Sequence, residues 1–223
     1  MTSVTMSRDE RVRLAAVLAT LLRWDDATRV RLLTSSRAVA VYADAPMGVL
    51  VFMALPLSEP PAEVVDQAVS AHRLRDILGD VAGGAAVRGD LAVAIPDPLD
   101  MPPALAVVPP SDGWISAERS TAADVAAVVE DGLAELKRQE LALAGADEAT
   151  RRSLAEQWWE QISWGGLPLK ALHAGRSMGM LSHPGARIES ATRAGWKRMA
   201  TPAGQVFVAP PQSYSGIALS VVR

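Results

Sequence analysis

The sequence predicts an α+β protein: an antiparallel sheet with flanking helices, followed by a helical C-terminal part that carries a β-hairpin. Three observations predict this class. Apolar residues recur with helical spacing in some segments, and β-rich runs joined by short turns occur in others. Six prolines between residues 96 and 110 separate two regions of such segments. Apolar residues make up 49% of the 223 residues, which is enough to build a core.

The N-terminal region is expected to combine one hairpin with two helices. Residues 7–24 form the first helix, because Ser7 and a glutamate three places later have the spacing of a capping box, and five apolar residues share one stripe. Strands at residues 37–43 and 48–55 are expected to pair as a β-hairpin. A second helix is expected from Pro61 to about Leu78, since proline is tolerated in the first helical turn.

The middle of the chain is expected to cross between two regions. Residues 91–95 read as a strand, and the proline-rich residues 96–110 read as an ordered crossover with a short strand at residues 105–108. An edge strand is expected at residues 113–117, anchored by its tryptophan. A long helix follows from residue 121 to about residue 143, where a Gly-Ala-Asp sequence ends the helical pattern.

The C-terminal part has the order of elements found in a winged helix. A helix at residues 148–164 leads into a tight turn at residues 165–168, and a second helix runs from Pro168 to about Leu181. Three strands then follow, at residues 187–192, 195–200 and 205–209. We therefore divide the chain into residues 1–110, an α+β sheet domain that includes the crossover 96–110; residues 111–150, a bridging helix region; and residues 151–223, a basic helix-turn-helix plus β-hairpin subdomain.

Charge is distributed unevenly between these regions. Residues 1–150 carry 13 basic and 22 acidic side chains, whereas residues 151–223 carry 9 basic and 3 acidic ones. A split of this kind indicates either that the basic part contacts anions or nucleic acid, or that it packs against the acidic part.

Several classes of function are excluded or not expected. The absence of cysteine excludes disulfides, thiolate nucleophiles and cysteine-ligated metals. The three histidines do not have metal-ligand spacing, and the glycines at residues 79–84 follow a helix rather than a strand, so we expect neither a metal nor a cofactor. No apolar run has the length of a membrane span, and the charged N-terminus is unlike a secretory signal, so a cytoplasmic protein with no membrane partner is expected.

The stretch from Gly175 to Gly179 matches the G-x-S-x-G pattern of serine hydrolases, with Ser177 as the nucleophile. That nucleophile requires a strand before it and a helix after it, and the acid and then the histidine must follow in the chain. Here a helical pattern precedes Ser177, and the only later histidine comes before the only later acid. Small-residue helix packing therefore explains the pattern better, and hydrolysis at Ser177 stays an alternative.

The sequence favours a non-catalytic, cytoplasmic interaction protein that binds a macromolecule through its basic C-terminal part. The expected partner is a protein or a second copy of the chain, and the alternative is a winged-helix nucleic-acid-binding regulator. Candidate binding residues lie on the second helix and on the hairpin of this part: Lys170, His173, Arg176, Ser177, Arg187, Arg193, Lys197 and Arg198.

Two segments resemble an uncharacterised actinobacterial protein family: the hairpin at residues 195–208, GWKRMATPAGQVFV, and the Gly-Leu-Pro sequence at residues 166–168 before a small-residue helix. The excess of arginine over lysine and the absence of asparagine are typical of the high-GC coding of such organisms. The family has no assigned activity, so the resemblance implies no functional residues.

Overall fold

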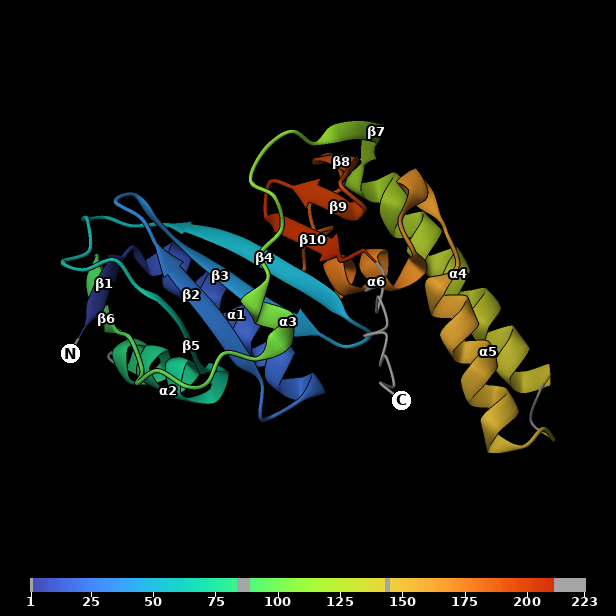
Figure 1. The fold of residues 1–223 in the computed structure, drawn as a ribbon, viewed down its shortest axis with the longest axis horizontal. Coiled ribbons are helices and arrows are strands. Elements are labelled where there is room, and N and C mark those ends of the chain that lie inside the picture. The colour runs from blue at the N-terminus through green and yellow to red at the C-terminus, as the bar shows by residue number, and fades with distance from the viewer. Residues whose placement is uncertain (1, 84–88, 143–144, 211–223) are drawn as a thin grey trace, which may run out of the picture.

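The computed structural model describes residues 2–83, 89–142 and 145–210 (Figure 1). Its main feature is an eight-stranded antiparallel sheet. In their order across the sheet, its strands are β5 (Asp66–Ser70), β2 (Arg29–Thr34), β3 (Ala38–Ala45), β4 (Val49–Pro56), β10 (Gly204–Val208), β9 (Trp196–Thr201), β8 (Arg187–Arg193) and β7 (Ile115–Thr121).

One continuous sheet joins the two halves of the chain at the pairing of β4 with β10. There Val49 lies opposite Val208 and Phe52 lies opposite Gln205. A helix followed by three antiparallel strands occurs on each side of this junction: α1 (Arg8–Trp24) leads into β2 to β4, and α6 (Leu169–Ser177) leads into β8 to β10. The two halves therefore share one ladder of hydrogen bonds.

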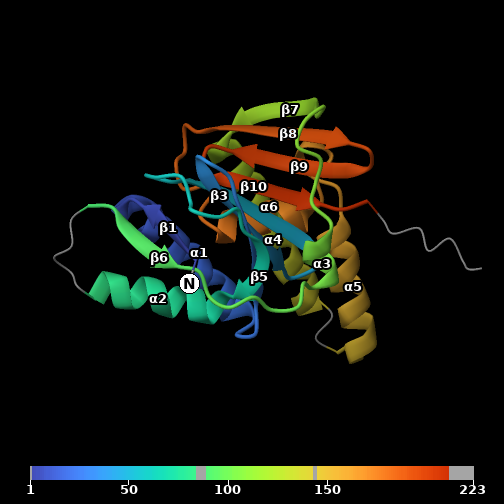
Figure 2. The same cartoon turned by 60° about the vertical axis from the view of Figure 1, so that its left-hand side comes forward.

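The helices cover one face of this sheet, and the main core lies between the two layers (Figure 2). This layer contains α1, α2 (Ala71–Gly83), α4 (Ala122–Ala142) and α6. The alternate residues of the strands that face it are buried, as shown by Val39, Val41 and Ala43 of β3. Helix α5 (Glu148–Glu160) has no buried residue; it lies beside α4, and the two helices extend together away from the sheet (Figure 1).

Three short elements complete the described fold. A two-stranded antiparallel sheet pairs β1 (Ser3–Met6) with β6 (Leu91–Ala94). The four-residue helix α3 (Pro103–Ala106) lies in the crossover, and the 3-10 turn η1 (Trp164–Gly166) joins α5 to α6. Within the described part of the chain, no helix combines the length and the apolar character needed to cross a membrane.

The α+β class, with its antiparallel sheet and flanking helices, is confirmed. Ser7 caps the first helix as expected, since its hydroxyl accepts a hydrogen bond from the Glu10 amide at 3.3 Å, while the Glu10 carboxylate pairs with Arg13. The predicted helix from Pro61 to Leu78 is wrong in its first half, where β5 pairs with β2 and only then does α2 begin at Ala71. Pairing with a neighbouring strand outweighs the helical spacing of the apolar residues there. The short strand predicted at residues 105–108 is also wrong, because α3 ends there.

The predicted winged-helix order is wrong, although most of its elements exist near the predicted positions. Strands β8 to β10 do not form a separate wing, because β10 pairs with β4 and β8 pairs with β7. Helix α6 packs on this sheet, and six of its nine residues are buried. A helix buried on this side has no free face to enter a DNA groove.

Candidate interaction surface

Five of the six predicted cations make a contact within the chain. Lys170 is 6% exposed, and its Nζ donates to the Met47 carbonyl oxygen at 2.9 Å and to the Glu160 carboxylate. This one side chain thereby ties α6 to the β3–β4 turn and to the end of α5. On the next turn of α6, Arg176 pairs with Glu130 of α4 at 2.7 Å.

The cations of the predicted hairpin are engaged in a similar way. Arg193 pairs with Asp112 at 2.5 Å, and the Nζ of Lys197 donates to the Gly166 carbonyl oxygen at 2.8 Å. The guanidinium of Arg198 lies 4.6 Å from the centre of the Trp114 ring. Arg187 is exposed at the start of β8. The predicted residues thus hold the C-terminal elements to one another, and the structure does not bring them together as one open basic surface.

Because these cations are engaged, we expect no measurable binding of duplex DNA. In a mobility-shift experiment with mixed-sequence duplex at low salt, no retarded band should form at protein concentrations up to about 10 µM, which lies within the range of nonspecific dissociation constants. A retarded band that weakens steeply between low and physiological salt would contradict this prediction, since that slope reports phosphates neutralised by free cations.

Ser177 is the last residue of α6, and a turn rather than a second helix follows it. The hydrolase pattern needs the serine on a turn from strand to helix, and that context is missing here. Gly175 serves packing instead. A Cβ at this position would collide with the Met199 side chain, so the glycine lets α6 lie close to β9.

His173 is half-buried on α6 and packs against Trp159 of α5, with ring centroids 5.1 Å apart. Its Nδ1 is buried without a hydrogen-bond partner among the described atoms. Burial, reinforced by the positive charge of Arg176, lowers the pKa of His173 below its usual value. The neutral ring is therefore the form that fits the contact between α5 and α6.

The lowered pKa of His173 predicts a pH dependence of stability. An unfolded chain takes up the proton below about pH 6.5, whereas the folded chain resists it, so stability is lost as the pH falls through this window. The His173→Phe variant keeps an aromatic ring against Trp159 and should not show this loss of stability as the pH falls. Urea unfolding of both proteins between neutral and acid pH measures it; parallel pH profiles would contradict the prediction.

The other face of the sheet is crossed by residues 96–114, which we call the strap. Residues of the sheet hold several points of its backbone between Pro96 and Ala106. The Leu99 amide donates to the Ala68 carbonyl oxygen at 2.8 Å, and Arg29 donates to the Asp100 carbonyl oxygen at 2.9 Å. At the far end of the strap, Arg193 holds Asp112. Strand residues that contact the strap therefore hold it against the sheet.

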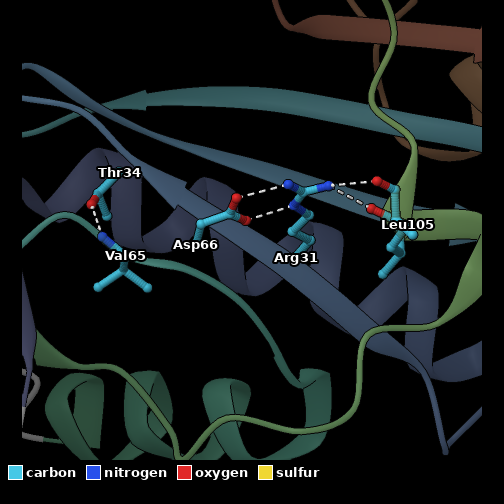
Figure 3. A network of polar contacts seen from close by, with 6 residues as sticks. Arg31, Thr34, Val65, Asp66 and Leu105 are labelled. Carbon is cyan, nitrogen blue, oxygen red and sulfur yellow. Dashed lines mark hydrogen bonds and ion pairs between the residues drawn. The ribbon is translucent and has the colours of Figure 1, made fainter.

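Arg31 of β2 makes the most extensive of these contacts (Figure 3). Its Nε and Nη2 donate to the two carboxylate oxygens of Asp66 at 2.6 and 2.8 Å. Its Nη1 donates to the carbonyl oxygens of Leu105 and Ala106 at 2.8 and 3.3 Å. The hydrogen bond from Arg31 lowers the pKa of Asp66. Figure 3 also shows Thr34, whose hydroxyl accepts the Val65 amide at 2.7 Å just before β5.

A second, smaller core lies between the strap and the sheet. Leu50, Leu105 and Phe207 are buried there. Five of the ten aromatic residues of the chain belong to it or pack against it: Tyr42, Phe52, Trp114, Trp196 and Phe207. The ring of Phe207 is central, with centroids 5.7 Å from Trp114, 6.3 Å from Phe52 and 6.5 Å from Trp196. The strap is thus packed as well as hydrogen-bonded.

The outer side of the strap exposes apolar side chains. Leu99, Val107 and Val108 are 42%, 60% and 39% exposed, although the backbone beside them is fixed. Next to them, a cleft of about 460 Å³ opens between the strap residues Asp100 to Pro103 and the ends of β2 and β3. Asp44 lines this cleft, and burial raises its pKa. Fixed apolar groups beside a cleft are typical of a surface that binds another molecule.

The arrangement of strands and helices has counterparts among solved structures. The sliding clamp of DNA polymerase from Pseudomonas aeruginosa matches with a TM-score of 0.55 at 10% identity, over 94% of this chain and 64% of that one. The β subunit of DNA polymerase III from Thermotoga maritima gives 0.55 at 10% identity, over 94% and 64%. The β clamp of H. pylori gives 0.54 at 11% identity, over 93% and 62%. The fold is similar to that of the sliding clamps.

The similarity to the clamps concerns the fold alone, because so few residues are identical. The chain also spans less than two thirds of the length of these clamps. Two family models match the chain, each described as a domain of unknown function: DUF8010 at residues 2–96 and DUF8185 at residues 109–213. No curated protein matches it. The first matched segment ends where the strap begins, the second begins within the strap at residue 109, and the two correspond to the two halves of the clamp-like sheet.

Sequence reasoning missed the residues that hold the strap. Arg31 and Asp66 were not singled out, because β2 was not expected and Asp66 was placed in a helix. A signal was present, since arginines at positions 29 and 31 alternate with the apolar residues at positions 30 and 32, which is typical of a half-buried strand. Within the described residues, no three His, Asp or Glu side chains are grouped so that they could hold a metal ion.

Proposed function

We propose that this protein is a non-catalytic, clamp-like scaffold that binds a partner protein on its strap. The observation that carries the proposal is the contrast between the two sides of the strap. Its inner side is fixed by Arg29, Arg31 and the aromatic cluster, while its outer side presents Leu99, Val107 and Val108 to solvent. A rigid backbone with exposed apolar side chains loses little entropy when a partner covers it.

The clamp-like fold also supports a non-catalytic binding role. The solved structures with a similar fold are described as sliding clamps or β subunits of DNA polymerase, which supports a role in protein interaction. In this chain, helices α4 and α5 do not favour DNA as the partner. Helices α4 and α5 carry eight acidic and four basic side chains, and phosphate contacts require the opposite excess.

Photo-crosslinking in the host cell tests this proposal. A benzophenone amino acid placed at Val107 should give one dominant crosslinked protein of discrete size. The same amino acid at Val12, a similarly exposed residue on the outer side of α1, is the matched control and should not give that species. Equal yields at the two positions, or no discrete species at Val107, would refute a binding role for the strap.

A further inference from the structure

Strand β7 leaves one edge of the eight-stranded sheet unpaired within the described part of the chain. Six of its seven residues are exposed, and Ile115 at its start is 71% exposed. A register shift between Ser116 and Glu118 interrupts its pairing with β8. This bulge shortens the regular, flat part of the strand edge. The edge therefore presents free backbone groups over a short length, as in domains that bind an extended peptide.

A cleft of about 640 Å³ lies at the end of this edge. It is lined by the last residues of β7, the first residues of β8 and the end of β9: Arg119, Ser120, Thr121, Arg187, Ile188, Glu189, Ala200, Thr201 and Pro202. Arg119 pairs with Glu189 at 2.9 Å, yet Arg119 remains 74% exposed. Arg198 approaches the same carboxylate at 3.7 Å, so two arginines share one acid.

The charges around the cleft leave room for one more anion. The nearby Asp124 carboxylate accepts hydrogen bonds from the hydroxyls of Ser120 and Thr121, and these bonds lower its pKa. The negative charge of Asp124 is therefore engaged by the hydroxyls of Ser120 and Thr121 at the start of α4. Arg187 lies opposite Thr121 in the β7–β8 pairing and is exposed at the cleft. A carboxylate bound here can pair with Arg187 and also with Arg119, which already pairs with Glu189.

Charge restricts how a second copy of the chain could pair with this edge about a twofold axis. When two β7 strands pair antiparallel about a twofold axis, paired side chains must lie on the same face of the sheet. Only registers that differ by a shift of two residues meet this condition. The register that pairs all seven residues places Glu118 opposite Glu118 of the second copy. Of the two neighbouring allowed registers, one places Arg119 opposite Arg119 and the other places Ala117 opposite Ala117. Like charges directly opposite each other destabilise a strand pair. Like charges therefore disfavour two of these three registers for a second copy.

We propose that an extended acidic segment of a partner protein adds to β7 as a ninth strand, with one carboxylate seated in the cleft against Arg187 and Arg119. Backbone hydrogen bonds along β7 supply the affinity, and the carboxylate selects the segment. A side chain directly opposite Arg119 in the added strand lies about 5 Å from it, within reach of its guanidinium. This surface is separate from the outer side of the strap, so it is tested independently of the function proposed above.

A designed peptide tests the proposal without knowledge of the natural partner. The probe is a fluorescent peptide of about nine residues that alternates threonine and valine and carries one central aspartate, a length that covers β7. We expect it to bind the full chain and to shift the amide NMR signals of β7. A peptide with lysine in place of the aspartate should bind at least about tenfold more weakly, as should a peptide with alternate backbone amides methylated.

Two variants of the protein complete the test. Arg187→Glu should weaken binding of the aspartate peptide by about tenfold or more, because it reverses the charge that faces the cleft. Arg151→Glu, an equally exposed change on α5, should leave binding unchanged. Equal binding of the aspartate and lysine peptides, an undiminished affinity of the Arg187→Glu protein, or no binding at about 1 mM peptide would each overturn the proposal.

Discussion

The Arg31→Ala variant should lose about 2–4 kcal/mol of unfolding free energy and release the strap. Four hydrogen bonds disappear, two to the Asp66 carboxylate and two to strap carbonyl oxygens. Urea unfolding measures the loss, and hydrogen exchange of the strap amides should rise in the same variant. Because the bond from Arg31 lowers the pKa of Asp66, part of the loss should vanish as the pH falls through that lowered pKa.

Arg29→Ala is the matched control for this prediction. Arg29 also contacts the strap, but through one exposed hydrogen bond to the Asp100 carbonyl oxygen, so its loss should cost only about 0.5–1 kcal/mol. Arg31→Lys keeps the positive charge but not the bidentate geometry of the guanidinium. Its loss of unfolding free energy should lie between those of Arg29→Ala and Arg31→Ala. Equal losses in the Arg29 and Arg31 variants, or unchanged exchange in the strap, would contradict the role given to Arg31.

The Gly165→Ala variant should lose about 2–4 kcal/mol, because two penalties act together. The backbone of Gly165 has φ +61, a region that side chains disfavour. A Cβ built there would also collide with the hydroxyl of Ser190 and lie 2.5 Å from its Cβ, and Ser190 is fully buried. Thermal or urea unfolding measures the combined loss.

Gly166→Ala separates the two penalties. Gly166 has a similar φ of +74, but a Cβ there meets nothing within 4 Å, so only the backbone cost of about 1–2 kcal/mol is expected. Adding Ser190→Gly to Gly165→Ala should recover part of the loss, since it removes the atoms that collide. If Gly165→Ala and Gly166→Ala were equally stable, close packing of the turn on β8 would not explain the choice of glycine.

Elements specified by local sequence could be predicted. The capped helix at residues 7–24, the hairpin of β3 and β4 and the strands of the C-terminal hairpin depend on neighbours a few residues away. Strand β5 could not, because its partner β2 lies about 35 residues earlier and supplies both the ladder and the arginine that binds Asp66. Local periodicity alone favours a helix there.

The charge asymmetry illustrates a different limit. Sequence alone left two explanations for the basic C-terminal part, and the described structure places Glu130, Glu160 and Asp112 against three of its cations. Two of these acids, Asp112 and Glu130, lie in the acidic part, residues 1–150, whereas Glu160 lies in the basic part itself. Composition counted over long segments cannot reveal such pairs, because they form only when α4, α5 and the strap meet the C-terminal sheet.

The clamp-like fold also could not be predicted from the sequence. It depends on the pairing of β4 with β10, which joins residues about 155 positions apart at the middle of the sheet. Neither strand carries a residue that specifies this partner, since both offer runs of consecutive apolar side chains. An identity of about 10% to the clamps leaves no motif that would have suggested the junction.

Affinity for the crosslinked partner, once that partner is purified, tests the proposed function most directly. The account predicts that replacing Val107 and Val108 together with aspartate weakens binding by at least about tenfold, since two exposed apolar contacts are lost. Val12→Asp on α1, an equally exposed apolar position, should leave the affinity unchanged. Undiminished binding by the strap variant, or an equal loss in the Val12 variant, would contradict the claim that the strap is the binding surface.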